Sequence, residues 1–119
     1  MVAAFAAAAD AVVACLCEDG ALERIVHHAA CDRTGRELVS MRVLDSAVHA
    51  WDLARAIAAD EILDDDLVAF LLAYTADLDL GPEQHAFARP DADVRGNASP
   101  QDQLLHRLGR HPHVAEEVP

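Results

Sequence analysis

The stretch that decides the fold is Arg36–Ala59, RELVSMRVLDSAVHAWDLARAIAA, because its apolar residues recur at helical spacing. At about 100° per residue, these side chains fall within one arc of a helix: Met41, Leu44, Ala47, Val48, Trp51, Ala54 and Ala58. We therefore expect a long helix that packs one apolar face into a core.

Three polar residues of this stretch lie beside the apolar arc rather than opposite it. Asp45 and His49 are four residues apart, so on a helix their Cβ atoms stand about 5–6 Å apart. A carboxylate oxygen and an imidazole nitrogen at that spacing can bind the same divalent cation, such as zinc. The spacing is equally typical of a surface ion pair or of a core histidine. Asp52 can orient the His49 ring as a hydrogen-bond acceptor, or pair with Arg55 on the helix surface.

Three further helices are predicted from composition and capping signals. Val2–Cys17 is rich in alanine and lacks Gly and Pro, and Gly20 is placed to adopt a left-handed conformation after it. Leu67–Leu78 follows Asp64 and Asp65, either of which can cap it. Gln101–Leu108 follows Ser99-Pro100 and ends at Gly109.

The fold class predicted from these elements is all-α. Residues 22–36 are ambiguous, and a short hairpin or an irregular crossover fits them equally well. We expect a helical-bundle portion over residues 1–80, a surface connection over 81–98, a C-terminal helix within 99–112 and a tail over 113–119.

The bulk composition excludes several classes of function. The chain has 119 residues, a net charge of −12 and no lysine, which disfavours binding to nucleic acid or to an anionic membrane. Residues 2–16 are apolar but too short to span a bilayer, and they lack the basic start of a signal peptide. We expect a cytoplasmic protein whose three cysteines are reduced, with Cys15 and Cys17 packed as small apolar residues.

Other chemistry-bearing residues give weaker signals. Gly-rich phosphate loops, a serine nucleophile elbow and paired C-x-x-C motifs are absent from the sequence. One of His27 and His28 can face a site beside His49, since neighbouring residues of an extended segment point to opposite sides. Four histidines read as surface or tail residues: His85, His106, His111 and His113.

Two motifs carry a resemblance to a known family. Val48-His49-Ala50-Trp51-Asp52-Leu53-Ala54-Arg55-Ala56 resembles the signature of the metal-binding domain of mycothiol-dependent maleylpyruvate isomerase, within the DinB-like four-helix-bundle superfamily. The run from Ser99 to Pro112, with Leu108-Gly109-Arg110-His111-Pro112 at its end, resembles the closing helix of the same proteins. The resemblance extends from about Phe5 to Pro112 and implies a partial up-down bundle.

The resemblance also implies a site. It implies a divalent metal, usually taken as zinc, with Asp45 and His49 as two ligands and Asp52 in a supporting role. The family's third ligand is a histidine on an upstream helix that has no counterpart here. This departure leaves three alternatives, namely a truncated product, completion of the site by a separate N-terminal segment or a homodimer, or loss of the metal.

The activity implied is a metal- and thiol-dependent isomerase or transferase reaction that uses mycothiol. Because a shared fold does not fix function, the competing expectation is a non-catalytic helical interaction module or a remnant that no longer binds metal.

Overall fold

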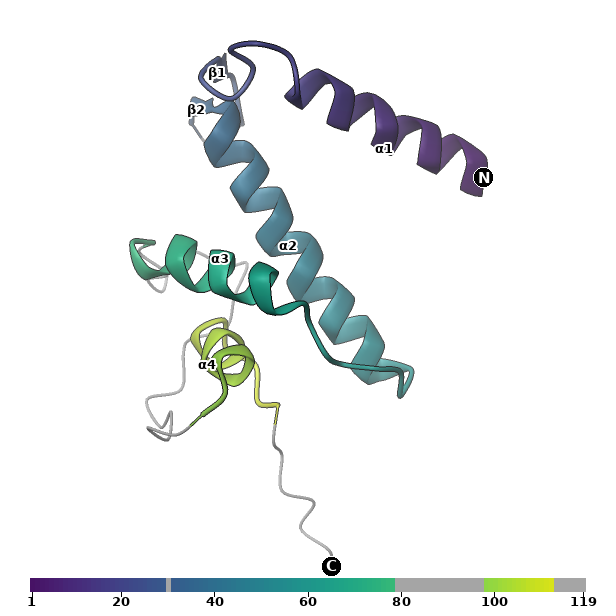
Figure 1. The fold of residues 1–119 in the computed structure, drawn as a ribbon, viewed down its shortest axis with the longest axis vertical. Helices are drawn as coiled ribbons and strands as arrows, with labels where there is room; N and C mark the ends of the chain where they lie inside the picture. The colour runs from purple at the N-terminus through teal and green to yellow at the C-terminus, as the bar shows by residue number, and fades with distance from the viewer. Residues whose placement is uncertain (30, 79–97, 113–119) are drawn as a thin grey trace, which may run out of the picture. The chain divides into compact units, whose positions relative to one another are not determined.

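The structure, a computed structural model, describes residues 1–29, 31–78 and 98–112. Its elements in chain order are α1 (Val2–Leu16), β1 (Ile25–Val26), β2 (Arg33–Thr34), α2 (Gly35–Ala56), α3 (Asp65–Ala76) and α4 (Pro100–Arg107) (Figure 1). The all-α prediction is confirmed, with a small hairpin between α1 and α2. The predicted surface connection, apart from Ala98, and the predicted tail lie outside the described residues.

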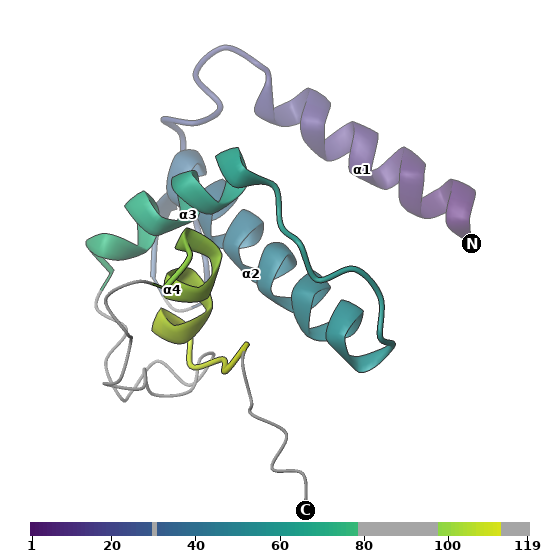
Figure 2. The same ribbon diagram turned by 60° about the horizontal axis from the view of Figure 1, so that its bottom comes forward.

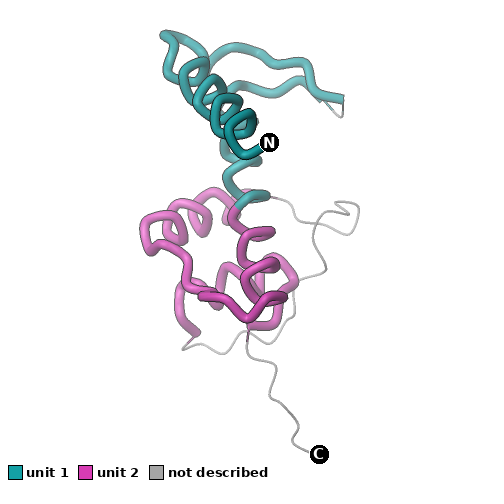
Figure 3. Tube along the Cα trace, turned by 90° about the vertical axis from the view of Figure 1, so that its right-hand side faces the viewer, with its two compact units in different colours: residues 1–46 teal, residues 47–119 magenta. Residues whose placement is uncertain are grey.

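The chain divides into two compact units, coloured separately in Figure 3. Unit 1 comprises residues 1–46 and unit 2 comprises residues 47–119. The division falls within α2, which is a single continuous helix from Gly35 to Ala56. No helix in the described part of the chain is long and apolar enough to cross a membrane.

The ambiguous segment of unit 1 forms a hairpin. Strands β1 and β2 pair antiparallel, with Ile25 opposite Thr34 and Val26 opposite Arg33. A capping box, which was not among the predicted helix signals, then starts α2. The Thr34 hydroxyl accepts a hydrogen bond from the Glu37 backbone N–H at 3.2 Å, and Glu37 accepts one from the Thr34 backbone N–H at 2.7 Å. The bond from the Thr34 backbone lowers the pKa of Glu37.

Helix α1 forms as predicted but buries none of its residues. Cys15 and Cys17 are exposed, so the prediction that they pack as small apolar residues is wrong, because α1 buries none of its side chains within the described residues of unit 1. Gly20 has a positive φ of 75°. It lies in the turn beyond the helix, whereas the residue that ends α1, Cys17, stays right-handed.

The core of unit 2 joins α3 and α4, which pack against each other (Figure 2). Four leucines in it are completely buried: Leu71, Leu104, Leu105 and Leu108. From α2, Val48 and Trp51 are also buried, as the apolar arc predicts. The predicted caps are present, since Asp64 accepts from the Leu67 N–H and Ser99 accepts from the Asp102 N–H.

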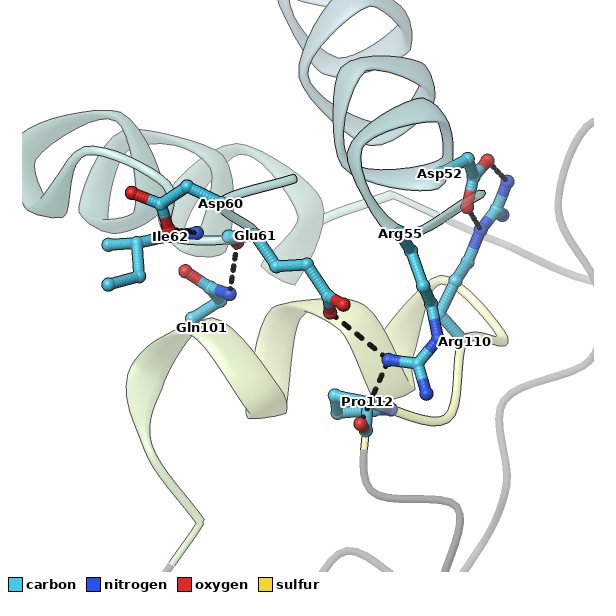
Figure 4. A network of polar contacts seen from close by, with 8 residues as sticks. All are labelled: Asp52, Arg55, Asp60, Glu61, Ile62, Gln101, Arg110 and Pro112. Atoms are coloured by element: carbon cyan, nitrogen blue, oxygen red, sulfur yellow. Dashed lines mark hydrogen bonds and ion pairs between the residues drawn. The ribbon is translucent and has the colours of Figure 1, made fainter. Parts of the chain in front are cut away.

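Polar contacts fix the ends of these helices to each other. Arg107 of α4 donates to the Leu72 carbonyl and to the Thr75 hydroxyl, both at 2.9 Å, near the C-terminal end of α3. Gln101 accepts from the Leu63 N–H at 2.8 Å and donates to the Glu61 carbonyl at 2.9 Å (Figure 4). The segment that leads into α3 is thereby held on α4.

Candidate metal centre

All three predicted site residues lie on α2 and follow one another by single turns. Asp45 and His49 are one turn apart, and Asp52 follows His49 by three residues. The Asp45 side chain is 48% exposed and the His49 side chain is 61% exposed, so both groups are accessible to an ion from solvent. The helix that the sequence predicts therefore presents the expected pair of ligand types.

Asp45 has Arg42 as an ionic neighbour, with 3.9 Å between the Arg42 Nη1 and Asp45 Oδ2 atoms. This i,i+3 contact is a different pair from the ion pair between Asp45 and His49 that their spacing also allowed. Because both side chains are about half exposed or more, solvent screens the attraction, and such pairs contribute little to stability. The Arg42–Asp45 pair therefore adds little to the stability of α2.

His49 faces Asp52 with its Nδ1 atom, 3.4 Å from Asp52 Oδ2. Carboxylate groups commonly hold the Nδ1 side of histidines that bind metals through Nε2. An orienting role of Asp52 toward the His49 ring requires a contact of this kind.

Asp52 is itself held by Arg110, which lies just after α4. The Arg110 Nη2 and Nε atoms donate to the two carboxylate oxygens at 2.7 and 3.2 Å (Figure 4). This two-pronged contact lowers the pKa of Asp52, and His49 lowers it further. The alternative pairing of Asp52 with Arg55 is not the one observed. The Arg110 partner is 58 residues away in sequence, where helical spacing gives no signal.

Arg55 also connects α2 to the segment that follows α4, through contacts that do not involve Asp52 or Arg110. Its Nη1 atom donates to the Pro112 carbonyl at 2.9 Å and to Glu61 at 3.1 Å (Figure 4). Its guanidinium also lies 5.2 Å from the ring centroid of Trp51. The two motifs that carry the family resemblance are thus bonded to each other through Asp52–Arg110 and Arg55–Pro112.

A third metal ligand is not found among the described residues, because no group of three His, Cys, Asp or Glu side chains there could hold an ion. His27, one of the two candidates for that role, lies 2.8 Å from Asp32. His106 and His111 stack edge to face, with 5.9 Å between ring centroids. His85 and His113 lie outside the described residues. Among the described residues, Asp45, His49 and Asp52 therefore do not by themselves form a group that could hold a metal ion.

The Asp52–Arg110 contact predicts a pH-dependent loss of stability. Replacing Asp52 by asparagine should lower the free energy of unfolding by about 1 kcal/mol at pH 7, a value that allows for solvent screening at a partly exposed pair. The pKa of Asp52 is lower in the folded state, so its contribution is complete above the ordinary pKa of about 3.9 and disappears as the pH falls through the folded value. Urea unfolding of both proteins from pH 7 to pH 3 measures this.

The matched control is Arg110→Gln, alone and combined with Asp52→Asn, in a double-mutant cycle at each pH. As the pH falls, the coupling energy between Asp52 and Arg110 should decrease. The difference in the free energy of unfolding between Asp52→Asn and the unsubstituted protein should decrease with it. A difference that stays constant down to pH 3 would show that Asp52 does not act as a carboxylate in this contact.

Comparison with known proteins finds similarity without an assigned activity. The chain is 35% identical over 79 residues to uncharacterized proteins from two strains of Mycobacterium tuberculosis. The aligned part is 64% of this chain and 43% of each relative, so the chain matches less than half the length of those proteins. No protein-family model matches the chain, and no solved structure matches it.

Proposed function

We propose that the protein is a helical-bundle protein that binds a divalent metal, for which zinc is the expected ion, through Asp45 and His49. One observation carries the proposal. His49 turns its Nδ1 atom toward Asp52 at 3.4 Å, while Asp52 is fixed by Arg110 at 2.7 Å. A histidine oriented by a fixed carboxylate is a common arrangement around bound zinc.

The proposed site is incomplete as described. Zinc in catalytic sites has three protein ligands and a water molecule, and two protein ligands hold it weakly. The proposal therefore includes a third ligand that the described residues of one chain do not supply, from a separate segment or from a second copy of the chain. Completion of this kind is compatible with the exposure of His49.

The proposal extends to the reaction that the metal site would catalyse. If the site is catalytic, a bound metal would polarise a small substrate, and a thiol such as mycothiol would supply the nucleophile. Asp45 and His49 would hold the ion, and Asp52 would orient His49. This chemistry depends on an open coordination position in addition to the third ligand.

A second candidate function is a non-catalytic helical interaction module. Two observations favour it, namely the contact between Asp45 and Arg42 and the lack of a third ligand in the described part of the chain. Under this proposal Asp52 and Arg110 only fasten the C-terminal segment to α2.

Chelation separates the two proposals. Because a ligand that binds only the folded state stabilises it by mass action, removing the metal with a chelator should lower the melting temperature of protein purified without a histidine tag. Restoring zinc should reverse the change. An unchanged melting temperature in both steps would favour the interaction module.

A further inference from the structure

The carboxylate that His49 faces is fixed at both of its oxygens by Arg110. The Arg110 Nη2 atom donates to Asp52 Oδ2 at 2.7 Å, and the Arg110 Nε atom donates to Asp52 Oδ1 at 3.2 Å. A planar guanidinium that bonds both oxygens sets the plane of the carboxylate as well as its position. All three residues lie within unit 2, so this arrangement is a property of that unit alone.

The Arg110 side chain takes its own position from the segment that closes the core of unit 2. Its Nη1 atom donates to the Leu108 carbonyl at 2.8 Å, and its backbone N–H donates to the Leu105 carbonyl at 2.8 Å. Both leucines are completely buried, and only 17% of the Arg110 side chain is exposed. The guanidinium is therefore held in place before any ligand reaches α2.

His49 faces the same oxygen that Arg110 holds most closely. The His49 Nδ1 atom lies 3.4 Å from Asp52 Oδ2, which is the oxygen that accepts from Arg110 Nη2. A carboxylate oxygen has two lone pairs, so it can accept from both groups at once. In a neutral histidine, the hydrogen bond made by one ring nitrogen decides which nitrogen carries the proton. A fixed acceptor beside Nδ1 therefore favours the proton on Nδ1 and leaves the lone pair on Nε2.

We infer that Arg110 is a positioning residue for His49, which acts through Asp52 to keep the proton of the neutral ring on Nδ1. The segment after α4 thereby controls the ring nitrogen that α2 can offer to a ligand. The effect of Arg110 on metal affinity rests on the proposed function, in which His49 binds the ion. The effect of Arg110 on the ring itself does not depend on a metal.

The first test reads the His49 ring in full-length protein treated with a chelator. Long-range proton–nitrogen NMR spectra distinguish a protonated ring nitrogen from a bare one, and His49→Gln identifies the signals of His49 by their loss. At about pH 9 an ordinary imidazole is neutral. The proton should then lie mainly on Nδ1 in the unsubstituted protein. Arg110→Gln and Asp52→Ala should each move it mainly to Nε2, the form that an unconstrained histidine prefers. Arg110→Lys should rescue only part of the difference, because an ammonium group lacks the fork that bonds two oxygens.

Arg55→Gln is the matched control, with the same change of side chain and of charge. Arg55 also bonds the segment after α4, through the Pro112 carbonyl at 2.9 Å, and its contacts do not include Asp52. This variant should keep the His49 proton on Nδ1. An equal response to Arg55→Gln would show that general loosening of the segment moves the proton, and it would overturn the inference. A ring that carries its proton on Nε2 in the unsubstituted protein, or that does not respond to Arg110→Gln, would overturn it as well. Circular dichroism checks that each variant stays helical.

Zinc titrations of the same variants separate this inference from the proposed function. Arg110→Gln should weaken zinc binding by about 10- to 100-fold, as the loss of an orienting partner does, and it should add nothing further to Asp52→Ala. If no variant binds zinc but the ring still responds to Arg110→Gln, the metal proposal fails and the positioning role of Arg110 stands. Zinc affinity and a ring proton that are both unchanged in Arg110→Gln would refute the positioning role alone.

Discussion

Replacing Leu71 by alanine should lower the free energy of unfolding of unit 2 by about 3 kcal/mol, as large-to-small changes in a core do. Leu71 is completely buried on α3, in the same core as Leu104, Leu105 and Leu108. Removing its side chain loses apolar burial and leaves a cavity that close-packed neighbours fill only in part. Since small domains are stable by only about 5–15 kcal/mol, this is a large share of the total. Urea unfolding followed by Trp51 fluorescence gives the value.

Leu53→Ala is the matched control for Leu71→Ala. Leu53 lies on α2 and is 60% exposed, so the same chemical change should cost no more than about 0.5 kcal/mol there. Equal losses from the two substitutions would mean that α3 and α4 do not form the core described above.

The second large effect is a loss of zinc binding, which we expect when His49 is replaced. Replacing it by alanine should abolish zinc binding, because the site would keep one protein ligand on α2. Asp52→Ala should weaken binding by about 10- to 100-fold without abolishing it, as the loss of an orienting partner typically does. Zinc titrations in competition with a chromophoric chelator measure both variants.

The control for His49→Ala is His111→Ala, since His111 is also exposed and lies within the predicted C-terminal motif. Its replacement should leave zinc affinity unchanged. A loss equal to that of His49→Ala would place the bound ion near the C-terminal segment instead of on α2.

Local signals in the sequence were sufficient to predict the helices. The 3.6-residue period identified α2 and most of its buried face, although the helix ends at Ala56 and Ala58 is exposed. Asp64 marked the start of α3, and Ser99-Pro100 marked the start of α4. Each of these signals depends on residues within one or two turns of one another. The capping box of Thr34 and Glu37 is equally local, so the same reasoning could have found it.

Contacts between distant segments could not be predicted in this way. Asp52 had a plausible partner three residues away in Arg55, but it bonds Arg110. Cys15 and Cys17 lie on a helix that the sequence predicts, yet their exposure depends on whether another segment covers that helix. For the same reason, the spacing of Asp45 and His49 predicts two metal ligands and gives no information about a third.

Metal binding through Asp45 and His49 is tested by the metal content of protein purified without a histidine tag. If a second copy of the chain supplies the third ligand, we expect bound zinc in a fixed ratio to the chain in the unsubstituted protein, as measured by mass spectrometry of the metal after gel filtration, and none in His49→Ala. Protein that carries no stoichiometric divalent metal, even after incubation with zinc, would contradict metal binding by the chain itself.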